Sequence, residues 1–135
     1  MDYIGRYDKG PRMSQVVVCY TGTVHFSGQV ASGDGIVAQT QAVLDKMEKL
    51  LNDHCSGGSG KGGKRRLLAV TIYITVPEHF DLMNEVWDKW VDPEHAPART
   101  TVIAQLAKPE FLIEITAIAA TSERESDRGA PGICL

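Results

Sequence analysis

Cysteine, charge of one sign and long apolar runs are all scarce in this chain, and each absence excludes a class of protein. The three cysteines, Cys19, Cys55 and Cys134, are odd in number and far apart, which favours reduced thiols in the cytoplasm over a disulfide framework. The net charge of −3 gives no overall attraction for nucleic acid. No apolar run approaches the roughly 20 residues that cross a membrane. We therefore predict a cytoplasmic protein, with neither a membrane nor a nucleic acid as partner.

The remaining composition is that of one ordinary globular domain. Of the 135 residues, 43% are hydrophobic and 23% are charged, which suits a single core. We predict that residues 1–120 form this domain and that the polar residues 121–135 form a loosely held tail. Residues 1–6 have no secretory apolar core, and the early Asp2 argues against a transit peptide.

Strand-like and helix-like patterns follow one another along the domain. Residues 1–14 are polar and contain Gly10-Pro11, so they are predicted to form an irregular arm. Beyond them, β-branched and alternating runs predict strands, and apolar residues with a period near 3.6 predict helices. The expected elements are strands at 16–20 and 23–27, a helix at 36–52, a strand at 67–76, a helix at 78–90, and strands at 100–106 and 111–119.

This order, β-β-α-β-α-β-β, predicts an α+β fold with one sheet and two helices on one of its faces. In the last strand, Phe111, Ile113, Ile115 and Ala117 share one face. The other face of such a sheet still carries apolar residues. Because a chain this short has nothing left to cover that face, we expect a homo-oligomer.

Arg99 is predicted to lie where a loop becomes a strand. Pro97 lacks a backbone donor and biases Ala96 toward an extended shape, and the β-branched residues of 100–103 start the strand. A guanidinium held at such a junction can bind a carboxylate with two parallel hydrogen bonds. Taken alone, the pattern also fits an ordinary surface arginine.

Glu114 is the second candidate for chemistry. It shares a strand face with Leu112 and Ile118, and a carboxylate among such neighbours needs either a partner or a role. A half-buried carboxylate can orient a water molecule and take its proton. An outward-facing carboxylate on a solvated strand face is the equal alternative.

A Gly/Ser-rich loop at residues 56–63 leads into Lys64, Arg65 and Arg66. Its spacing resembles a P-loop, but Arg65 stands where a Ser or Thr would meet magnesium, and the loop follows a helix instead of a strand. We therefore predict a flexible, solvated basic loop and no phosphate site. Contact of Lys61 and these three residues with RNA is the alternative.

Metal and cofactor sites find no support in the residue pattern. The four histidines, His25, His54, His79 and His95, have no ligand spacing. Cys19 lies in an apolar run and is predicted to be a small core residue. No serine elbow and no cofactor fingerprint occurs, so we expect neither a metal nor a cofactor.

Six short motifs, taken in order, resemble one known family. They are Ser27–Val30, Gln39–Leu44, Val70–Ile74, Met83–Trp87, Pro97–Val102 and Ile113–Ala119. Together they are similar to the Rid (reactive intermediate deaminase) family, also called YjgF/YER057c/UK114, over about residues 12–120. The resemblance implies a chorismate-mutase-like fold and a homotrimer with clefts between subunits. It also implies hydrolysis of 2-imino or enamino acids, such as 2-aminoacrylate, to 2-oxo acids and ammonia.

The resemblance also assigns roles to individual residues. It implies that Arg99 binds the substrate carboxylate and that Glu114 positions the attacking water. Ser27, Gly28 and Thr101 would line the cleft, and Thr101 stands where many members have cysteine. Asn84 matches a recurring asparagine.

Two departures from the family pattern concern the arm and the basic loop. Members of the best-known subgroup have a cleft tyrosine where Met13 is the nearest residue here. The substrate pocket is then either more apolar or served by another tyrosine, such as Tyr20. The loop at residues 56–66 is longer than usual. Two other functions stay open, an endoribonuclease that uses the basic loop and a non-catalytic trimer that binds carboxylates.

Overall fold

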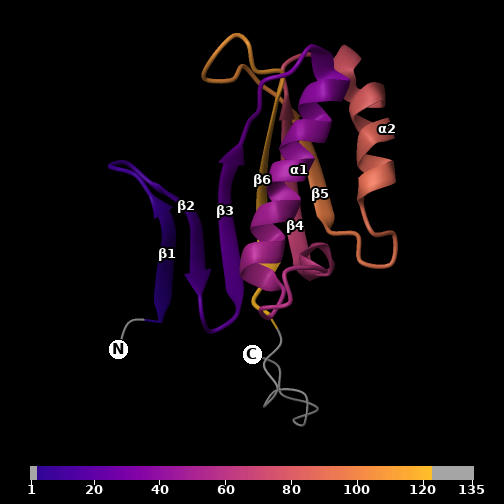
Figure 1. The fold of residues 1–135 in the computed structure, drawn as a ribbon. Helices are drawn as coiled ribbons and strands as arrows, with labels where there is room; N and C mark the ends of the chain where they lie inside the picture. Colours follow the sequence, from indigo (N-terminus) through magenta and orange to yellow (C-terminus); the bar gives the residue numbers. More distant parts are fainter. Residues whose placement is uncertain (1–2, 123–135) are drawn as a thin grey trace.

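Two α-helices lie on one face of a six-stranded mixed sheet in the computed structural model, which describes residues 3–122 (Figure 1). The elements in chain order are β1 (Ile4–Lys9), β2 (Ser14–Cys19), β3 (Thr23–Gln29), α1 (Gly35–Cys55), η1 (Gly63–Arg66), β4 (Leu67–Ile74), η2 (Pro77–His79), α2 (Phe80–Trp90), β5 (Ala98–Ile103) and β6 (Ile113–Ala120). The strand order across the sheet is β1-β2-β3-β6-β4-β5. Only the β4–β5 pair among these is parallel, with α2 as its crossover. The predicted α+β class is confirmed.

The prediction of an irregular arm is wrong, because residues 4–9 form the edge strand β1. It pairs antiparallel with β2 from Ile4 opposite Cys19 to Lys9 opposite Ser14. The polar residues hid this strand, since an edge strand needs one backbone partner and only a little apolar surface. The predicted tail covers residues 121–135. Of these, only Thr121 and Ser122 are described, and residues 123–135 lie outside the described residues.

Smaller differences concern where the other elements end. The first helix is longer than predicted and reaches Cys55, and the second begins with the 3₁₀ turn η2. The predicted strand at 100–106 stops at Ile103, because its partner β4 ends at Ile74. The last strand begins at Ile113, since Leu112 is held instead by Gln39, whose Oε1 accepts a hydrogen bond from the Leu112 amide at 2.8 Å.

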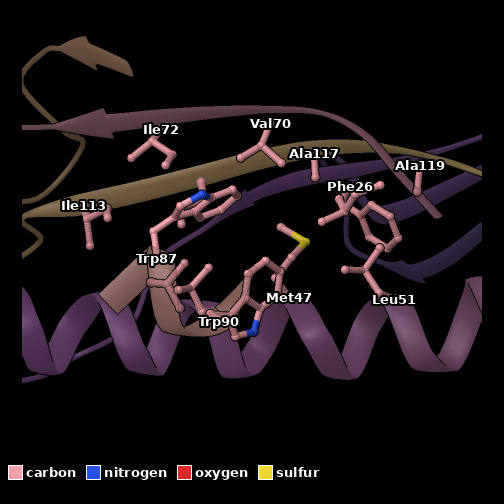
Figure 2. Close-up of a cluster of buried hydrophobic side chains, with 14 of the residues drawn as sticks. Phe26, Met47, Leu51, Val70, Ile72, Trp87, Trp90, Ile113, Ala117 and Ala119 are labelled. Carbon is pink, nitrogen blue, oxygen red and sulfur yellow. The ribbon is translucent and has the colours of Figure 1, made fainter. Parts of the chain in front are cut away.

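The core lies between the sheet and the two helices. The alternating strand residues supply one side of it. Ile113, Ile115 and Ala117, which were predicted to share a face, are buried together with Ala119, whereas Phe111 precedes β6 and is half-buried. Figure 2 shows Met47 and Leu51 of α1 and Trp87 of α2 directed toward these strands. The Trp90 ring lies beside α1, where its Nε1 donates to Glu48 Oε1 at 2.9 Å. In α2, the apolar residues Phe80, Met83, Trp87 and Trp90 recur at steps of three and four. Met83, Trp87 and Trp90 are buried, but Phe80 is 40% exposed.

The turn η1 packs very closely against the last turns of α1. Gly63 is buried, and its amide donates to Asn52 Oδ1 at 2.9 Å. A side-chain carbon at Gly63 would meet the backbone carbonyl of Leu51 and would lie 2.8 Å from the Asn52 amide nitrogen. Glycine is required here by the approach of two backbones.

No element of residues 3–122 covers the sheet face opposite the helices. Alternation places Val17, Tyr73, Val102 and Ile118 on this face, and Val102 and Ile118 are 36% and 37% exposed. Apolar side chains therefore remain at the surface of the isolated subunit. The expected homo-oligomer stays a prediction.

Candidate active site

The predicted site residues fall into two clusters. Arg99, Thr101 and Asn84 lie between β5 and α2, and we call them the arginine cluster. Ser27, Gly28 and Glu114 lie where β3 meets β6, and we call them the glutamate cluster. Each cluster is built by its own pair of elements.

Arg99 occupies the second position of β5, which confirms its predicted place at a loop–strand junction. It lies opposite Val70 of β4 and therefore faces the helices. The guanidinium carbon is 5.5 Å from the centre of the Trp87 ring and 6.0 Å from that of the Phe80 ring. These two cation–π contacts hold the guanidinium beside α2.

The hydrogen-bond donors of Arg99 remain available. Among residues 3–122, the Arg99 side chain forms no hydrogen bond and no ion pair. Ring faces attract its charge but do not use its in-plane N–H groups. The half-buried guanidinium can therefore bind a planar anion such as a carboxylate with two parallel hydrogen bonds.

Asn84 and Thr101 flank the arginine from the helix and the strand. Asn84 lies one turn from both Phe80 and Trp87 and so shares their face of α2. Its Oδ1 is buried and accepts no hydrogen bond from any described residue. Thr101 is half-buried and two residues beyond Arg99, on the same face of β5. The cluster thus offers a cation, an unused acceptor and a hydroxyl to a small polar ligand.

Glu114 is positioned by a bulge in β3. Phe26 pairs with Ala117 and Gln29 pairs with Ile115, so β3 has one extra residue at Ser27-Gly28. A side-chain carbon at Gly28 would lie 2.7 Å from the Glu114 carboxyl carbon and closer still to one of its oxygens. Only glycine leaves the carboxylate its present place.

A short hydrogen-bond network holds the bulge. Ser27 Oγ donates to Gln15 Oε1 at 2.7 Å, and Gln29 Nε2 donates to the same oxygen at 2.9 Å. Gln29 Nε2 also lies 3.0 Å from the Ser27 carbonyl oxygen. The two glutamines therefore fix Ser27 and Gly28 from the neighbouring strand and from β3 itself.

Met13 lies at the same end of the sheet as the glutamate cluster. It ends the β1–β2 turn, where its carbonyl accepts from the Gly10 amide at 2.7 Å, and its side chain is 46% exposed. Tyr20 lies at the opposite end of β3 and hydrogen-bonds to Tyr7. Within one subunit, Met13 therefore lies nearer to the glutamate cluster than Tyr20 does.

One subunit does not bring Arg99 and Glu114 together. Glu114 pairs with Tyr73, which pairs with Val102, so it faces away from the helices, whereas Arg99 faces them. Along the strands the two residues differ by three positions, about 10 Å, and across the sheet by two strands, about 10 Å. A small substrate therefore cannot contact both side chains within one subunit.

Some residues that support these clusters were not identified from the sequence. Neither Gln15 nor Gln29 was assigned a role, because their contacts depend on the bulge and on strand pairing. Phe80 and Trp87 have the helical spacing of core residues, and that spacing also places their rings beside Arg99 once α2 packs against β5. The predicted core residue Cys19 is half-buried and hydrogen-bonds to Thr21 at 3.0 Å, so that prediction is wrong.

Residues 3–122 contain neither a cluster of metal-ligating side chains nor a membrane-spanning helix. No group of three or more His, Cys, Asp or Glu side chains in this range is arranged to hold a metal ion. None of the helices in the same range has the length and apolar character that a membrane crossing demands.

The sequence matches known proteins over nearly all of its described length. The family model described as Endoribonuclease L-PSP matches residues 7–121. A RutC family protein of Haemophilus ducreyi is 35% identical over 123 residues, which are 90% of this chain and 99% of that protein. The RutC family protein YoaB of Escherichia coli is 34% identical over 118 residues, 87% of this chain and 97% of that protein.

Solved structures give the same result. A YjgF-family protein of Neisseria meningitidis superposes with a TM-score of 0.81 at 33% identity, over 90% of this chain and 97% of that one. The Yersinia pestis protein YyfA, of the conserved Rid family, superposes with a TM-score of 0.71 at 25% identity. That match covers 84% of this chain and 90% of YyfA.

Proposed function

This chain belongs to the endoribonuclease L-PSP family, which includes the YjgF and RutC proteins, and from that premise we propose that it is a hydrolytic deaminase. Its substrates are 2-imino acids and the enamino acids that tautomerise to them, of the 2-iminopropanoate, 2-iminobutanoate and 2-aminoacrylate type. Its products are the 2-oxo acid and ammonia. The observation that carries the proposal is the Arg99 guanidinium, which two aromatic rings hold and whose donors have no partner within residues 3–122.

The reaction needs little beyond positioning of the two reactants. Arg99 binds the carboxylate of the imino acid, and the imine nitrogen carries a proton that makes its carbon electrophilic. Glu114 accepts a proton from water as the water oxygen bonds to that carbon. Glu114 then gives this proton to the amine nitrogen of the carbinolamine. As the C–N bond breaks and ammonia leaves, the carbinolamine hydroxyl gives its proton to the Glu114 carboxylate and the C=O bond forms. Fixing substrate and water in this geometry supplies much of the rate gain.

The separation of Arg99 and Glu114 supports a shared site. In the proposed homotrimer, the arginine cluster of one subunit faces the glutamate cluster of the next across a cleft. The uncovered sheet face supplies apolar surface for this assembly. Thr101 and the backbone at Gly28 bind the polar edges of the substrate, and Met13 makes the cleft wall more apolar than a tyrosine would.

Mixing two inactive variants tests the shared site. Glu114→Gln and Arg99→Ala should each be inactive, but trimers made by refolding the two together should recover about a quarter of the wild-type ammonia release. In random mixtures, that fraction of clefts receives an intact arginine and an intact glutamate. Each variant refolded alone is the control. Mixed trimers that form, as judged by sedimentation, but stay inactive would show that one chain supplies both residues.

A second prediction concerns the glycine beside the catalytic carboxylate. Gly28→Ala should lower kcat/KM for imine hydrolysis about 10- to 100-fold, because the new methyl displaces the Glu114 carboxylate. Gly22→Ala is the matched control, since a side-chain carbon there meets no atom within 4 Å. Steady-state ammonia release with enzymatically generated imines measures the effect. If the two variants were equally active, Glu114 would have no part in the reaction.

The same assay on a panel of imines decides between the remaining functions. Hydrolysis that depends on Arg99 supports the deaminase, whereas carboxylate binding without ammonia release would point to a ligand-binding protein. The family model's description keeps an RNA-cleaving activity as the second candidate. The basic loop lines a pocket that includes neither Arg99 nor Glu114 of the same subunit.

A further inference from the structure

A cavity lies at the end of α1, beneath the Gly/Ser/Lys loop, which has no role in the proposed deaminase reaction. Its volume is about 430 Å³, which falls in the range of about 300 to 1,000 Å³ typical of small-molecule sites. It is formed where the loop, η1, the segment after α2 and the end of β6 meet. The lining residues are Cys55, Ser56, Gly57, Ser59, Lys61, Gly62, Arg65, Arg66, His95 and Ser122.

The cavity carries positive charge, and residues 3–122 contribute no carboxylate to its wall. Lys61, Arg65 and Arg66 line it, and none of the lining residues in that range is acidic. Burial raises the pKa of the Cys55 thiol to about 11, so this side chain adds no negative charge near neutral pH. In a protein whose net charge is −3, three cationic side chains around one cavity form a local anion-attracting field.

Arg66 is held in this cavity with its bonding incomplete. Its Nη2 donates to the Thr121 carbonyl at 2.7 Å, which fixes the guanidinium plane. Its Nε is buried and has no acceptor among the residues that the structure describes. A partly buried guanidinium with one neutral acceptor lacks the counter-charge that such groups normally have.

Internal hydrogen bonds cross the Gly/Ser/Lys loop above the cavity. Ser56 Oγ accepts from the Gly60 amide at 3.0 Å, and Ser59 Oγ donates to the Lys61 carbonyl at 2.9 Å. These internal bonds hold Lys61 over the cavity, while η1 holds Arg65 and Arg66 at its wall. The basic side chains are therefore placed around one space before any ligand arrives.

We propose that this cavity binds the phosphate group of a small phosphate monoester. A phosphate dianion presents three acceptor oxygens, which match two guanidinium groups and one ammonium better than a single carboxylate does. The remaining volume takes the organic part of the ligand. The site differs from a P-loop, because side chains from several elements supply it in place of one strand–loop–helix unit. It is also separate from Glu114, since Ser122 lies about 25 Å farther along β6 and its continuation.

Titration calorimetry at low ionic strength tests the assignment with ribose 5-phosphate, ribose and gluconate. Wild-type protein should bind ribose 5-phosphate, and the double variant Lys61→Gln/Arg65→Gln should bind it at least about tenfold more weakly. Lys61 and Arg65 are exposed and their side chains form no hydrogen bond within residues 3–122, so the fold should be unchanged. Lys89→Gln removes an exposed charge on α2, outside the cavity, and should alter the affinity less than about twofold.

Each other outcome overturns the proposal. If the wild-type protein does not bind ribose 5-phosphate, the cavity is not a phosphate site. If the double variant and Lys89→Gln lose affinity equally, the binding reflects only general charge attraction. If gluconate binds as tightly as ribose 5-phosphate, the cavity binds anions in general and has no preference for phosphate. An RNA oligonucleotide that binds through Lys61 and Arg65 while ribose 5-phosphate does not would make this surface an RNA contact.

Discussion

Replacing Arg99 with alanine should abolish ammonia release, with kcat/KM falling at least about 100-fold, while the fold stays intact. The substitution removes a bidentate, charge-assisted contact to the substrate carboxylate, worth about 3 kcal/mol or more. Folding does not depend on this contact, since Arg99 has no hydrogen bond or ion pair within residues 3–122. Ammonia release from imines generated in situ measures the loss of activity. Sedimentation of the variant measures whether the protein remains folded and assembled.

A conservative substitution separates geometry from charge at this position. Arg99→Lys keeps the positive charge but offers one ammonium in place of the planar fork, so it should remain severely impaired. Lys89→Ala, on the exposed face of α2, is the control for loss of a cation and should keep full activity. An Arg99→Ala protein that hydrolyses imines as fast as wild type would end the deaminase proposal.

Replacing Gly63 with alanine should have the largest effect on stability. The added carbon would meet the backbone of Leu51 and Asn52, which cannot move without opening the end of α1. We expect the free energy of unfolding to fall by about 3 kcal/mol or more, at the upper end of the cost of overpacking. Urea unfolding followed by tryptophan fluorescence measures this loss, because Trp87 and Trp90 are buried in the core.

Gly22→Ala supplies the comparison for that experiment. Gly22 lies in the β2–β3 turn, and a side-chain carbon there has no atom within 4 Å. Its substitution should change the unfolding free energy by less than about 1 kcal/mol. A Gly63→Ala protein as stable as the Gly22→Ala protein would mean that η1 does not pack against α1 as described.

Local patterns in the sequence predicted the parts of the fold that local physics controls. Alternation in residues 113–119 identified the buried face of β6, and Pro97 with the β-branched residues after it placed Arg99 at the start of β5. The strand β1 was missed because its stability comes from pairing with β2, fifteen or fewer residues away, and not from its own composition. Propensity alone cannot report such a partner.

The arrangement of the site depended on register, which no single segment contains. The sequence placed Arg99 and Glu114 on strands, but their faces follow from pairing through Val70 and Tyr73 of β4. A shift of one residue would reverse either side chain. The basic cavity was missed for the same reason, since His95 and Ser122 join the loop only in the folded chain.

The place of β6 in the sheet has a consequence for how the chain folds during synthesis. This last strand lies between β3 and β4, and Phe26 pairs with Ala117 across most of the sequence. Until β6 leaves the ribosome, the β1–β3 meander and the β4–β5 pair are two halves with open inner edges. Closure of such distant pairs is slow, and open edges invite pairing with other chains. We infer that this protein completes its fold only once β6 is free to pair with β3 and β4, and that truncation within β6 leaves chains that aggregate or require chaperones.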